Sequence, residues 1–398
     1  MVTPVSVSIL GATGSVGRSA AAVIRQSPGR FRVEAVAGGS NAHALAALAR
    51  ELGARCAAIS SEAAYQDLKD ELSGSGIIAM AGADAVCEAA ARPADRVVAA
   101  ITGIAGLAST CAALACGATV ALANKEAMVS AGAAVLAIAK KGGARILPLD
   151  SEHNSVFQAL GGADMAAVDR IALTASGGPF RTWTCDEIAA ATVEQALKHP
   201  NFAMGAKITI DSASMMNKGL ELIEAHHLFA LPEEQIEVVV HPQQAIHGLV
   251  YFTDGSVNAG MAVPDMQVPM ANCLAWPERC DSGAKKLDLI ALGRLDFFAP
   301  DLDKFPSLRL ARQALRAGGA LPTVLNAANE VAVAAFLDRR IGFADIVKTV
   351  ETVMNMPSMA ALPCPGSIDD AVSVDQSARY RTQEVLSQLP ARGIFAGR

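Results

Sequence analysis

Charged and aromatic residues are scarce in this sequence. Asp, Glu, Lys and Arg make up 18% of the 398 residues and aromatic residues 4%, whereas 52% are hydrophobic. A chain of this composition can bury a large core and is not disordered, and its length favours two or three domains. The net charge of −6 and the scattered basic residues indicate no nucleic-acid surface, although they leave room for a local cationic pocket for an anionic substrate.

Disulfide and targeting patterns are missing as well. The eight cysteines form no C-x-x-C pair and no regular framework, so we expect reduced thiols packed as small hydrophobic groups in a cytoplasmic protein. The N-terminal stretch MVTPVSVSILGATG has neither the basic region nor the cleavage site of a signal peptide. The uncharged run 97–124 is long enough to span a membrane, but its glycines, serine and threonine favour a buried strand, helix and second strand, with no membrane contact.

Short apolar runs alternate with Ala-rich amphipathic stretches over residues 1–150. The expected strands are 5–10, 31–37, 56–60, 76–81, 96–101, 118–123 and 144–149. Such alternation is typical of α/β proteins with a parallel, doubly wound sheet. We therefore assign residues 1–150 to an N-terminal Rossmann-type domain.

The pattern changes after residue 150. Residues 170–176 resemble a strand, 206–229 a strand followed by a helix, and 236–262 strands joined by a turn at TDGS. This mixture predicts a central α+β domain, the catalytic one, over residues 151–280.

The last part of the chain is mostly helical in its periodicity. Residues 281–310, rich in Asp, Pro and Leu, are expected to form an extended linker. Residues 311–398 follow as a C-terminal helical bundle, with helix starts near Pro306, Pro322 and Ser367.

A glycine-rich loop follows the first strand. Gly11, Gly14 and Gly17 lie between that strand and a helix, where they allow the backbone to approach a pyrophosphate at the helix N-terminus. The second strand ends in GGSN (38–41), and its one acid, Glu34, lies earlier inside the strand. Because no carboxylate would repel a 2′-phosphate at this point, NADP is favoured over NAD.

Acidic residues follow two later strands, in NKE (124–126) and DSE (150–152). On an extended chain Asp150 and Glu152 point the same way, and two hard oxygen ligands suit Mg²⁺ or Mn²⁺ better than zinc. A solvated acidic turn, or a helix N-cap at Ser151, explains the same residues without a metal.

A second polar group lies at 211–225, DSASMMNKGLELIEA. Asp211 and Ser212 are expected to cap a helix on which Asn217 and Glu221 share one face. Lys218 beside them adds a phosphate donor, and Glu221 a third carboxylate for the metal.

Two neighbouring segments complete the candidate site. The glycine-rich turn ASGGPF (175–180) offers an anion-binding nest with the Ser176 hydroxyl, or is a plain tight turn. KHPNFAMGAK (198–207) predicts a flap carrying His199. Glu224 and His226 are expected on an ordinary exposed helix face.

Together these stretches resemble one family, the 1-deoxy-D-xylulose 5-phosphate reductoisomerases of the non-mevalonate route of isoprenoid biosynthesis. The likeness runs from end to end, and it is carried by GATGSVG, ALANKEAMVSAG, LDSEHNSVFQ, TASGGPFR, KHPNFAMGAKITIDSASMMNKGLELIEAHHLF and HPQQAIHGLVYFTDGS. It implies a homodimeric, NADPH-dependent oxidoreductase that needs Mg²⁺ or Mn²⁺. Its reaction would convert 1-deoxy-D-xylulose 5-phosphate to 2-C-methyl-D-erythritol 4-phosphate.

The resemblance also implies roles for individual residues. The metal would be bound by Asp150, Glu152 and Glu221. The substrate would contact Lys125, Ser151, Glu152, Ser176, His199, Ser212, Asn217, Lys218 and Glu221, and the NADPH site would be lined by Thr13, Gly14, Ser15, Val16, Gly39, Ser40, Asn41, Asn124, Glu126 and Gly205. The catalytic residues would be Lys125, Asp150, Glu152, Glu221 and His199. The implied chemistry is a metal-assisted retro-aldol and aldol rearrangement followed by hydride reduction.

Two departures and two alternatives accompany this hypothesis. The family usually has tryptophan where this chain has Phe202, and many members have a basic residue within the segment matching 39–41. GATGSVG also resembles semialdehyde dehydrogenases, but their thioester chemistry needs an activated cysteine at a helix N-terminus, and Cys111, Cys116 and Cys185 show no such setting. A non-catalytic NADP-binding sensor explains the glycine loop but not three acids beside a phosphate pocket.

Overall fold

The computed structural model describes residues 3–198 and 205–389. Contacts divide the chain into two compact units. The first unit comprises the described residues up to Ala127 together with Ala134–Gly161 and Gly260–Asp288. The second unit comprises Met128–Ala133, Gly162–Ala259 and the described residues from Leu289 onward.

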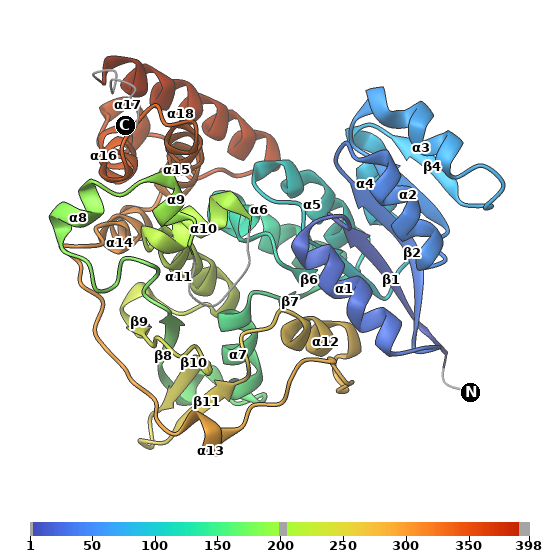
Figure 1. Ribbon diagram of the computed structural model, residues 1–398, viewed down its shortest axis with the longest axis horizontal. Helices are drawn as coiled ribbons and strands as arrows, with labels where there is room; N and C mark the ends of the chain where they lie inside the picture. The colour runs from blue at the N-terminus through green and yellow to red at the C-terminus, as the bar shows by residue number, and fades with distance from the viewer. Residues whose placement is uncertain (1–2, 199–204, 390–398) are drawn as a thin grey trace. The chain divides into compact units, whose positions relative to one another are not determined.

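The first unit is built on a parallel sheet of seven strands in the order β4-β3-β2-β1-β5-β6-β7 (Figure 1). The strands are β1 (Val5–Leu10), β2 (Phe31–Gly38), β3 (Cys56–Ile59), β4 (Ile78–Ala81), β5 (Arg96–Ala99), β6 (Thr119–Leu122) and β7 (Arg145–Pro148). Each overlaps a predicted strand, so the Rossmann-type sheet is confirmed. The strands β1 and β2 are buried almost throughout because helices cover both faces of such a sheet.

Helices connect and cover these strands. They are α1 (Ser15–Gln26), α2 (Ala42–Glu51), α3 (Tyr65–Glu71), α4 (Ala83–Ala91), α5 (Leu107–Ala115), α6 (Lys125–Gly142), α7 (Ser151–Leu160) and α12 (Gln267–Ala275), with short 3-10 helices at Glu62–Ala64 and Ile104–Gly106. The uncharged run 97–124 forms β5, α5 and β6, as predicted. Among the helices of residues 3–198 and 205–389, none has the length and hydropathy that crossing a membrane requires.

One helix joins the first unit from far along the chain. α12 packs against α1, and its Met270, Cys273 and Leu274 enter the core formed by Val7, Ile9 and other residues of the sheet. The contacts therefore place Gly260–Asp288 with the Rossmann-type sheet, although those residues follow the central strands in sequence.

The second unit contains a sheet of four strands in the order β11-β10-β8-β9. These are β8 (Val168–Ala175), β9 (Ile236–Val240), β10 (Ile246–Phe252) and β11 (Val257–Met261), and short 3-10 helices precede β8 at Met165–Ala167 and β9 at Glu233–Gln235. β10 runs antiparallel to β8, whereas β9 runs parallel to β8. The mixed α+β character is therefore confirmed. The predicted turn forms between β10 and β11, where Asp254 Oδ1 accepts a hydrogen bond from Ser256 N over 2.8 Å.

Helices form the remainder of the second unit. They are α8 (Cys185–Ala189), α9 (Val193–Ala196), α10 (Ala206–Ala213), α11 (Met216–Phe229), α13 (Leu289–Leu292), α14 (Ser307–Ala317), α15 (Leu321–Leu337), α16 (Phe343–Met354), α17 (Pro357–Ala360) and α18 (Ile368–Gln388). The helical C-terminal part is confirmed, with Pro306 directly before α14, Pro322 in the first turn of α15 and Ser367 capping α18. α11 shares one core with this bundle, through Met216, Leu220 and Ile223 against Leu310, Val324 and Leu325.

The strand predicted at the start of 206–229 is wrong. The β-branched run Ile208, Thr209 and Ile210 favours a strand locally, yet residues 206–213 form helix α10. Thr209 N donates to Gly205 O over 3.1 Å, and the Thr209 hydroxyl bonds to the same carbonyl. Tertiary packing overrides the local preference because Thr209, Ile210 and Ala213 are buried together.

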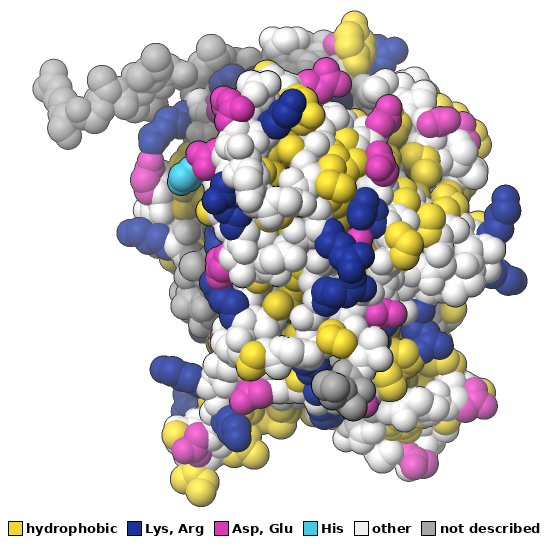
Figure 2. Space-filling view, turned by 90° about the vertical axis from the view of Figure 1, so that its right-hand side faces the viewer, with side chains coloured by type: hydrophobic (Ala, Val, Ile, Leu, Met, Phe, Trp, Pro, Cys, Tyr) yellow, Lys and Arg dark blue, Asp and Glu magenta, His cyan; other side chains and the backbone are white. Residues whose placement is uncertain are grey.

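Charge on the surface is mixed. On the face shown in Figure 2, Lys and Arg side chains are interspersed with Asp and Glu, and the largest group of basic side chains lies near the centre of that view. This face therefore carries charge of both signs, as is usual for a solvent-exposed surface.

Candidate active site

The glycine loop between β1 and α1 has the geometry that a pyrophosphate requires. Gly11 has φ +80°, and a Cβ there would lie 2.4 Å from Ala100 O. A Cβ at Gly17 would lie 2.4 Å from Ala12 O, so only glycine allows this helix to start so close to the strand. Gly14 occupies the N-cap position, and among the described residues no side chain caps it, which leaves the first amides of α1 for an anion.

The residues predicted to line the NADPH site follow the carboxyl ends of strands β1, β2 and β6 of the first unit's sheet. Gly205, which belongs to the second unit, is the exception. β1 has β2 on one side and β5 on the other, so the connections diverge there, and ligands of such folds bind at that point. Thr13, Gly14, Ser15 and Val16 follow β1, Gly39, Ser40 and Asn41 follow β2, and Asn124 and Glu126 follow β6. The residues therefore fit a dinucleotide.

Two asparagines of this set have structural roles. Asn41 Oδ1 accepts from Ala44 N over 2.9 Å and caps α2, while Asn124 Oδ1 accepts from Ala127 N over 3.0 Å and caps α6. Asn124 also donates to Gly103 O over 3.0 Å. Glu34 is buried inside β2 and paired with Arg92 over 2.9 Å, so its carboxylate is committed to the fold.

The two acids after β7 lie at the start of a helix. Asp150 is the N-cap of α7 and Glu152 lies in its first turn, so the extended geometry predicted for them is wrong: the chain turns helical at Ser151. Glu152 is only 6% exposed, which excludes a solvated acidic turn. The N-cap position falls on Asp150, one residue before the predicted Ser151.

A buried ion pair joins this turn to α6. Lys125 Nζ lies 2.5 Å from Asp150 Oδ2, and Ser151 Oγ donates to Glu152 Oε2 over 2.5 Å. Lys125 is 5% exposed, so this charge is held away from water. Two carboxylates in one buried turn are hard oxygen donors of the kind that Mg²⁺ or Mn²⁺ takes, and the residues therefore fit a divalent cation.

The first turns of α11 carry a matching polar group in the second unit. Asn217 Nδ2 donates to Glu221 Oε1 over 2.5 Å, which confirms that these residues share one face. Lys218 forms a salt bridge with Glu221, and both side chains are almost fully buried. The predicted capping role of Asp211 and Ser212 is wrong, because both lie inside α10 and α11 follows Met215, which has φ 61°.

The sequence does not predict the burial of Glu224. Glu224 is 0% exposed, so the expected exposed helix face is wrong for this residue, and His226 is half-buried with Nδ1 2.7 Å from Leu231 O. Glu224 follows Glu221 by one turn on a helix that is otherwise mostly apolar. That spacing was a usable signal for a second inward-facing carboxylate.

The Ser176 turn packs against the end of α10. Gly177 and Gly178 have φ +83° and +66°, and Gly178 N donates to Ser176 Oγ over 3.1 Å. A Cβ at Gly178 would lie 2.8 Å from Ser212 O, so the two segments are in close contact. The structure thus brings together the Ser176 turn and the helix of Ser212, which are 36 residues apart in sequence. His199 and Phe202 of the predicted flap lie outside the described residues; Gly205 is the N-cap of α10.

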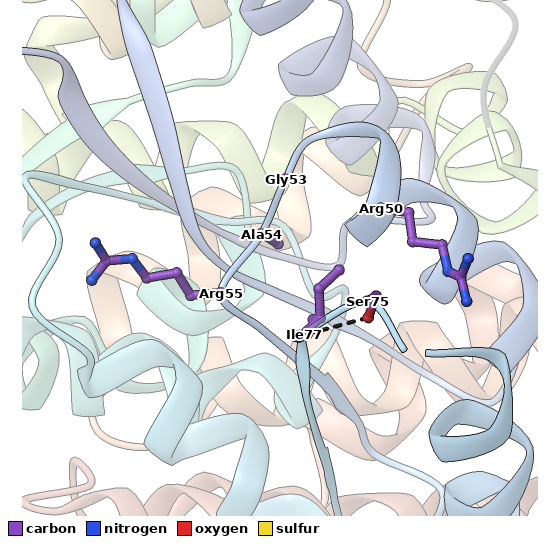
Figure 3. Close-up of a pocket in the computed structure, with 7 residues that line it drawn as sticks. Arg50, Gly53, Ala54, Arg55, Ser75 and Ile77 are labelled. Carbon is purple, nitrogen blue, oxygen red and sulfur yellow. Dashed lines mark hydrogen bonds between the residues drawn. The ribbon is translucent and has the colours of Figure 1, made fainter. Parts of the chain in front are cut away.

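A cavity of about 290 Å³ lies at the amino ends of strands in the first unit's sheet, whereas the glycine loop lies at the carboxyl end of β1. It is lined by Arg50, Gly53, Ala54, Arg55, Ser75, Gly76 and Ile77, which precede β3 and β4. Arg50 and Arg55 point away from each other, so their charges do not converge on one anion (Figure 3). The cavity is therefore no part of the candidate site.

The cysteines give no support to thioester chemistry. Burial raises the pKa of Cys111 to about 11 and that of Cys273 to about 12, so neither is a ready thiolate. Cys185 does occupy the first position of a helix, contrary to expectation, but α8 has only five residues and Cys185 is exposed.

Comparisons with known proteins agree across the chain. Family models match at residues 7–132 (1-deoxy-D-xylulose 5-phosphate reductoisomerase), 146–229 (the C-terminal domain of that enzyme) and 261–381 (DXP reductoisomerase C-terminal domain). The reductoisomerase of Afipia carboxidovorans is 55% identical over 96% of this chain and 94% of its own length, and that of Bradyrhizobium sp. is 52% identical over 97% and 95%.

Solved structures agree with this result. The Zymomonas mobilis enzyme in complex with NADPH is 47% identical, with a TM-score of 0.91 over 97% of this chain and 100% of the other. A DOX-P reductoisomerase in complex with NADPH, fosmidomycin and magnesium is 43% identical, with a TM-score of 0.92 over 96% and 98%. The chain therefore belongs to the 1-deoxy-D-xylulose 5-phosphate reductoisomerase family.

Proposed function

We propose that this chain converts 1-deoxy-D-xylulose 5-phosphate to 2-C-methyl-D-erythritol 4-phosphate, with NADPH as reductant and Mg²⁺ or Mn²⁺ as cofactor. Family membership over nearly the whole chain carries this conclusion. The complexes of relatives with NADPH and with magnesium support the choice of cofactors. The buried pair of Lys125 and Asp150 supports a reaction in which charge develops away from water.

Asp150 and Glu152 of the first unit, with Glu221 of the second, would hold the divalent cation. Once bound, the cation supplies Lewis-acid stabilisation of negative charge on the carbonyl and hydroxyl oxygens of the substrate during the retro-aldol and aldol steps. Lys125 would donate to an oxygen that gains negative charge. Glu152, oriented by its hydrogen bond from Ser151, would contact the substrate and accept a proton from its hydroxyl group.

The phosphate end of the substrate would be held by the second unit. Ser176, Ser212, Asn217 and Lys218 supply two hydroxyls, an amide and an ammonium, and the packing of Gly178 on Ser212 supports their convergence. Binding energy from this remote group would keep the two fragments in place between cleavage and rejoining. His199 would contact the substrate from the flap.

NADPH would bind at the glycine loop and supply the hydride that reduces the aldehyde intermediate. Thr13, Gly14, Ser15 and Val16 would face its phosphates, with Gly39–Asn41, Asn124, Glu126 and Gly205 completing the site. In this proposal residues 1–150 bind NADPH and also supply Lys125 and Asp150, 151–280 supply the other metal and substrate contacts, 281–310 connect, and 311–398 form the helical domain.

We further propose a homodimer in the cytoplasm. β11 is an edge strand of the second unit's sheet. Val257 on β11 is 46% exposed and Ile290 94%, which favours cover by a second copy. Lysine at both positions should shift the mass measured by light scattering from dimer to monomer.

The free state of all eight cysteines is consistent with a reducing compartment.

The direct test is NADPH absorbance at neutral pH with 1-deoxy-D-xylulose 5-phosphate, with Mg²⁺ or Mn²⁺ and again after EDTA. Oxidation that requires both substrate and metal is the expected result. NADPH binding without any metal-dependent oxidation would overturn the catalytic assignment and favour a binding protein.

A further inference from the structure

A hydrogen bond from α15 holds α10, the helix that carries Ser212. Asn329 Nδ2 donates to Asp211 Oδ1 over 2.7 Å, and Lys207 Nζ lies 2.9 Å from Asp211 Oδ2. Asn329 is 0% exposed and Asp211 1%, and 118 residues separate them in sequence. Because both partners are buried, water cannot replace either one, and the carboxylate depends on this amide.

The helix needs such a contact because it is short. α10 has eight residues, and an isolated helix of that length is not stable in water. Its last turn meets the Ser176–Gly178 turn on one side, where a Cβ at Gly178 would lie 2.8 Å from Ser212 O. Asn329 supplies the contact through the neighbouring residue, Asp211.

We propose that Asn329 is a positioning residue for the phosphate end of the substrate. Through Asp211 it holds the last turn of α10, and with it Ser212, against the Ser176 turn. Asn329 itself touches no phosphate in this scheme, and the inference rests on the phosphate-binding role proposed above for Ser176 and Ser212. Without the amide, the buried carboxylate keeps Lys207 alone as partner, and the end of α10 loses its fixed register.

The same helix offers a matched control. Asn326 lies one turn earlier on α15 and is also 0% exposed, but its Nδ2 donates to Glu330 Oε1 over 3.2 Å on its own helix. Asn326→Leu therefore removes an equally buried amide from α15 while the hydrogen bond from Asn329 to Asp211 stays in place. Its stability loss should resemble that of Asn329→Leu.

The experiment compares the wild-type protein, Asn329→Leu, Asn326→Leu and the exchange Asp211→Asn with Asn329→Asp. For each we would measure KM for the sugar phosphate, kcat, the inhibition constant of inorganic phosphate and the Kd of NADPH. Asn329→Leu should raise KM and the phosphate constant about tenfold or more over Asn326→Leu, with NADPH affinity unchanged. The exchange restores an amide–carboxylate bond and should recover most of this loss.

Equal KM and phosphate constants for Asn329→Leu and Asn326→Leu would overturn the proposal. Should Asn329→Leu fail to fold, Asn329→Ala takes its place, because it removes the amide that donates to Asp211 without adding bulk to the core. It should raise both constants about threefold or more, and unchanged constants would equally contradict the role. A wild-type protein without turnover would instead refute the proposed function, and binding of inorganic phosphate by calorimetry would still decide the role of Asn329.

Discussion

The glycine loop of the first unit and the α10–α11 corner of the second are both proposed anion sites, yet they are made from different parts of the chain. The loop uses backbone: Gly11 and Gly17 let the chain pass close to Ala100 and Ala12, and the first amides of α1 would bind the proposed ligand. The corner uses buried side chains, among them Lys218 paired with Glu221.

This difference decides how each site is recognised and how it fails. A backbone site is local, because three glycines at fixed spacing already describe it. A side-chain site depends on partners brought from elsewhere, such as Asn329, which lies 118 residues from Asp211. The two sites should therefore break separately, one through nucleotide binding and the other through substrate binding and turnover.

The largest effect is expected at the proposed metal ligands. Glu221→Gln keeps the shape of the side chain but removes a carboxylate charge, and it should lower kcat about a thousandfold while NADPH affinity stays within about twofold. Asp150→Asn should behave alike. Turnover is measured as NADPH oxidation, and the affinity for NADPH by fluorescence titration. Loss of NADPH binding in either variant would contradict the separation of the two sites.

Gly17→Ala, which adds a methyl group, tests the backbone site of the first unit. The methyl group would meet Ala12 O at 2.4 Å and Gly11 O at 2.5 Å, and since both are backbone atoms neither can turn aside. Gly17→Ala should raise the Kd of NADPH about a hundredfold and lower the melting temperature. Gly366→Ala is the control, because its Cβ makes one ordinary contact, 3.6 Å from Asp370 Oδ2. An NADPH affinity equal to that of the control would refute the tight loop.

The second unit should also respond to acid through His227. Burial, with a smaller effect of His226, lowers the pKa of His227 to about 4. The unfolded chain takes up this proton near pH 6.5 and the folded chain near pH 4, so the free energy of unfolding falls as pH drops through that window. The loss should reach about 2 kcal/mol at pH 5 relative to pH 7.

Urea denaturation at the two pH values measures this loss. The two tryptophans, Trp183 and Trp276, lie in different units, so fluorescence in a Trp276→Phe background reports the second unit. His227→Gln should remove about 2 kcal/mol of the pH dependence. If the variant and its parent lose stability equally, the buried neutral histidine is not the cause.

The smallest effects are expected at two helix caps, one in each unit. Asn41 accepts from Ala44 N at the start of α2, and Ser367 from Asp370 N at the start of α18. Alanine at either position should cost about 1 kcal/mol of unfolding free energy. Only Asn41→Ala should also weaken NADPH binding, because Asn41 follows β2 at the proposed nucleotide site. Equal NADPH affinity in both variants would show that Asn41 serves the fold alone.

The sequence was sufficient wherever structure depends on near neighbours. Alternating apolar runs predicted the seven-stranded sheet, and the glycine spacing placed the loop after β1. The pair Asn217 and Glu221 was found because four residues make one helical turn. Each of these signals lies within a short stretch of chain, where steric limits and helix geometry act directly.

Prediction failed where distant contacts decide. The β-branched start of α10 resembled a strand, but tertiary packing makes the segment a helix. Asp211 resembled a helix cap, but it lies inside α10 and accepts a hydrogen bond from Asn329. Glu224 resembled an exposed acid and is fully buried. The sequence by itself determined the parallel sheet, the glycine loop and the family. Only the tertiary structure decided which polar groups are buried and which partners satisfy them, because desolvation and hydrogen bonding depend on chain segments that meet only after folding.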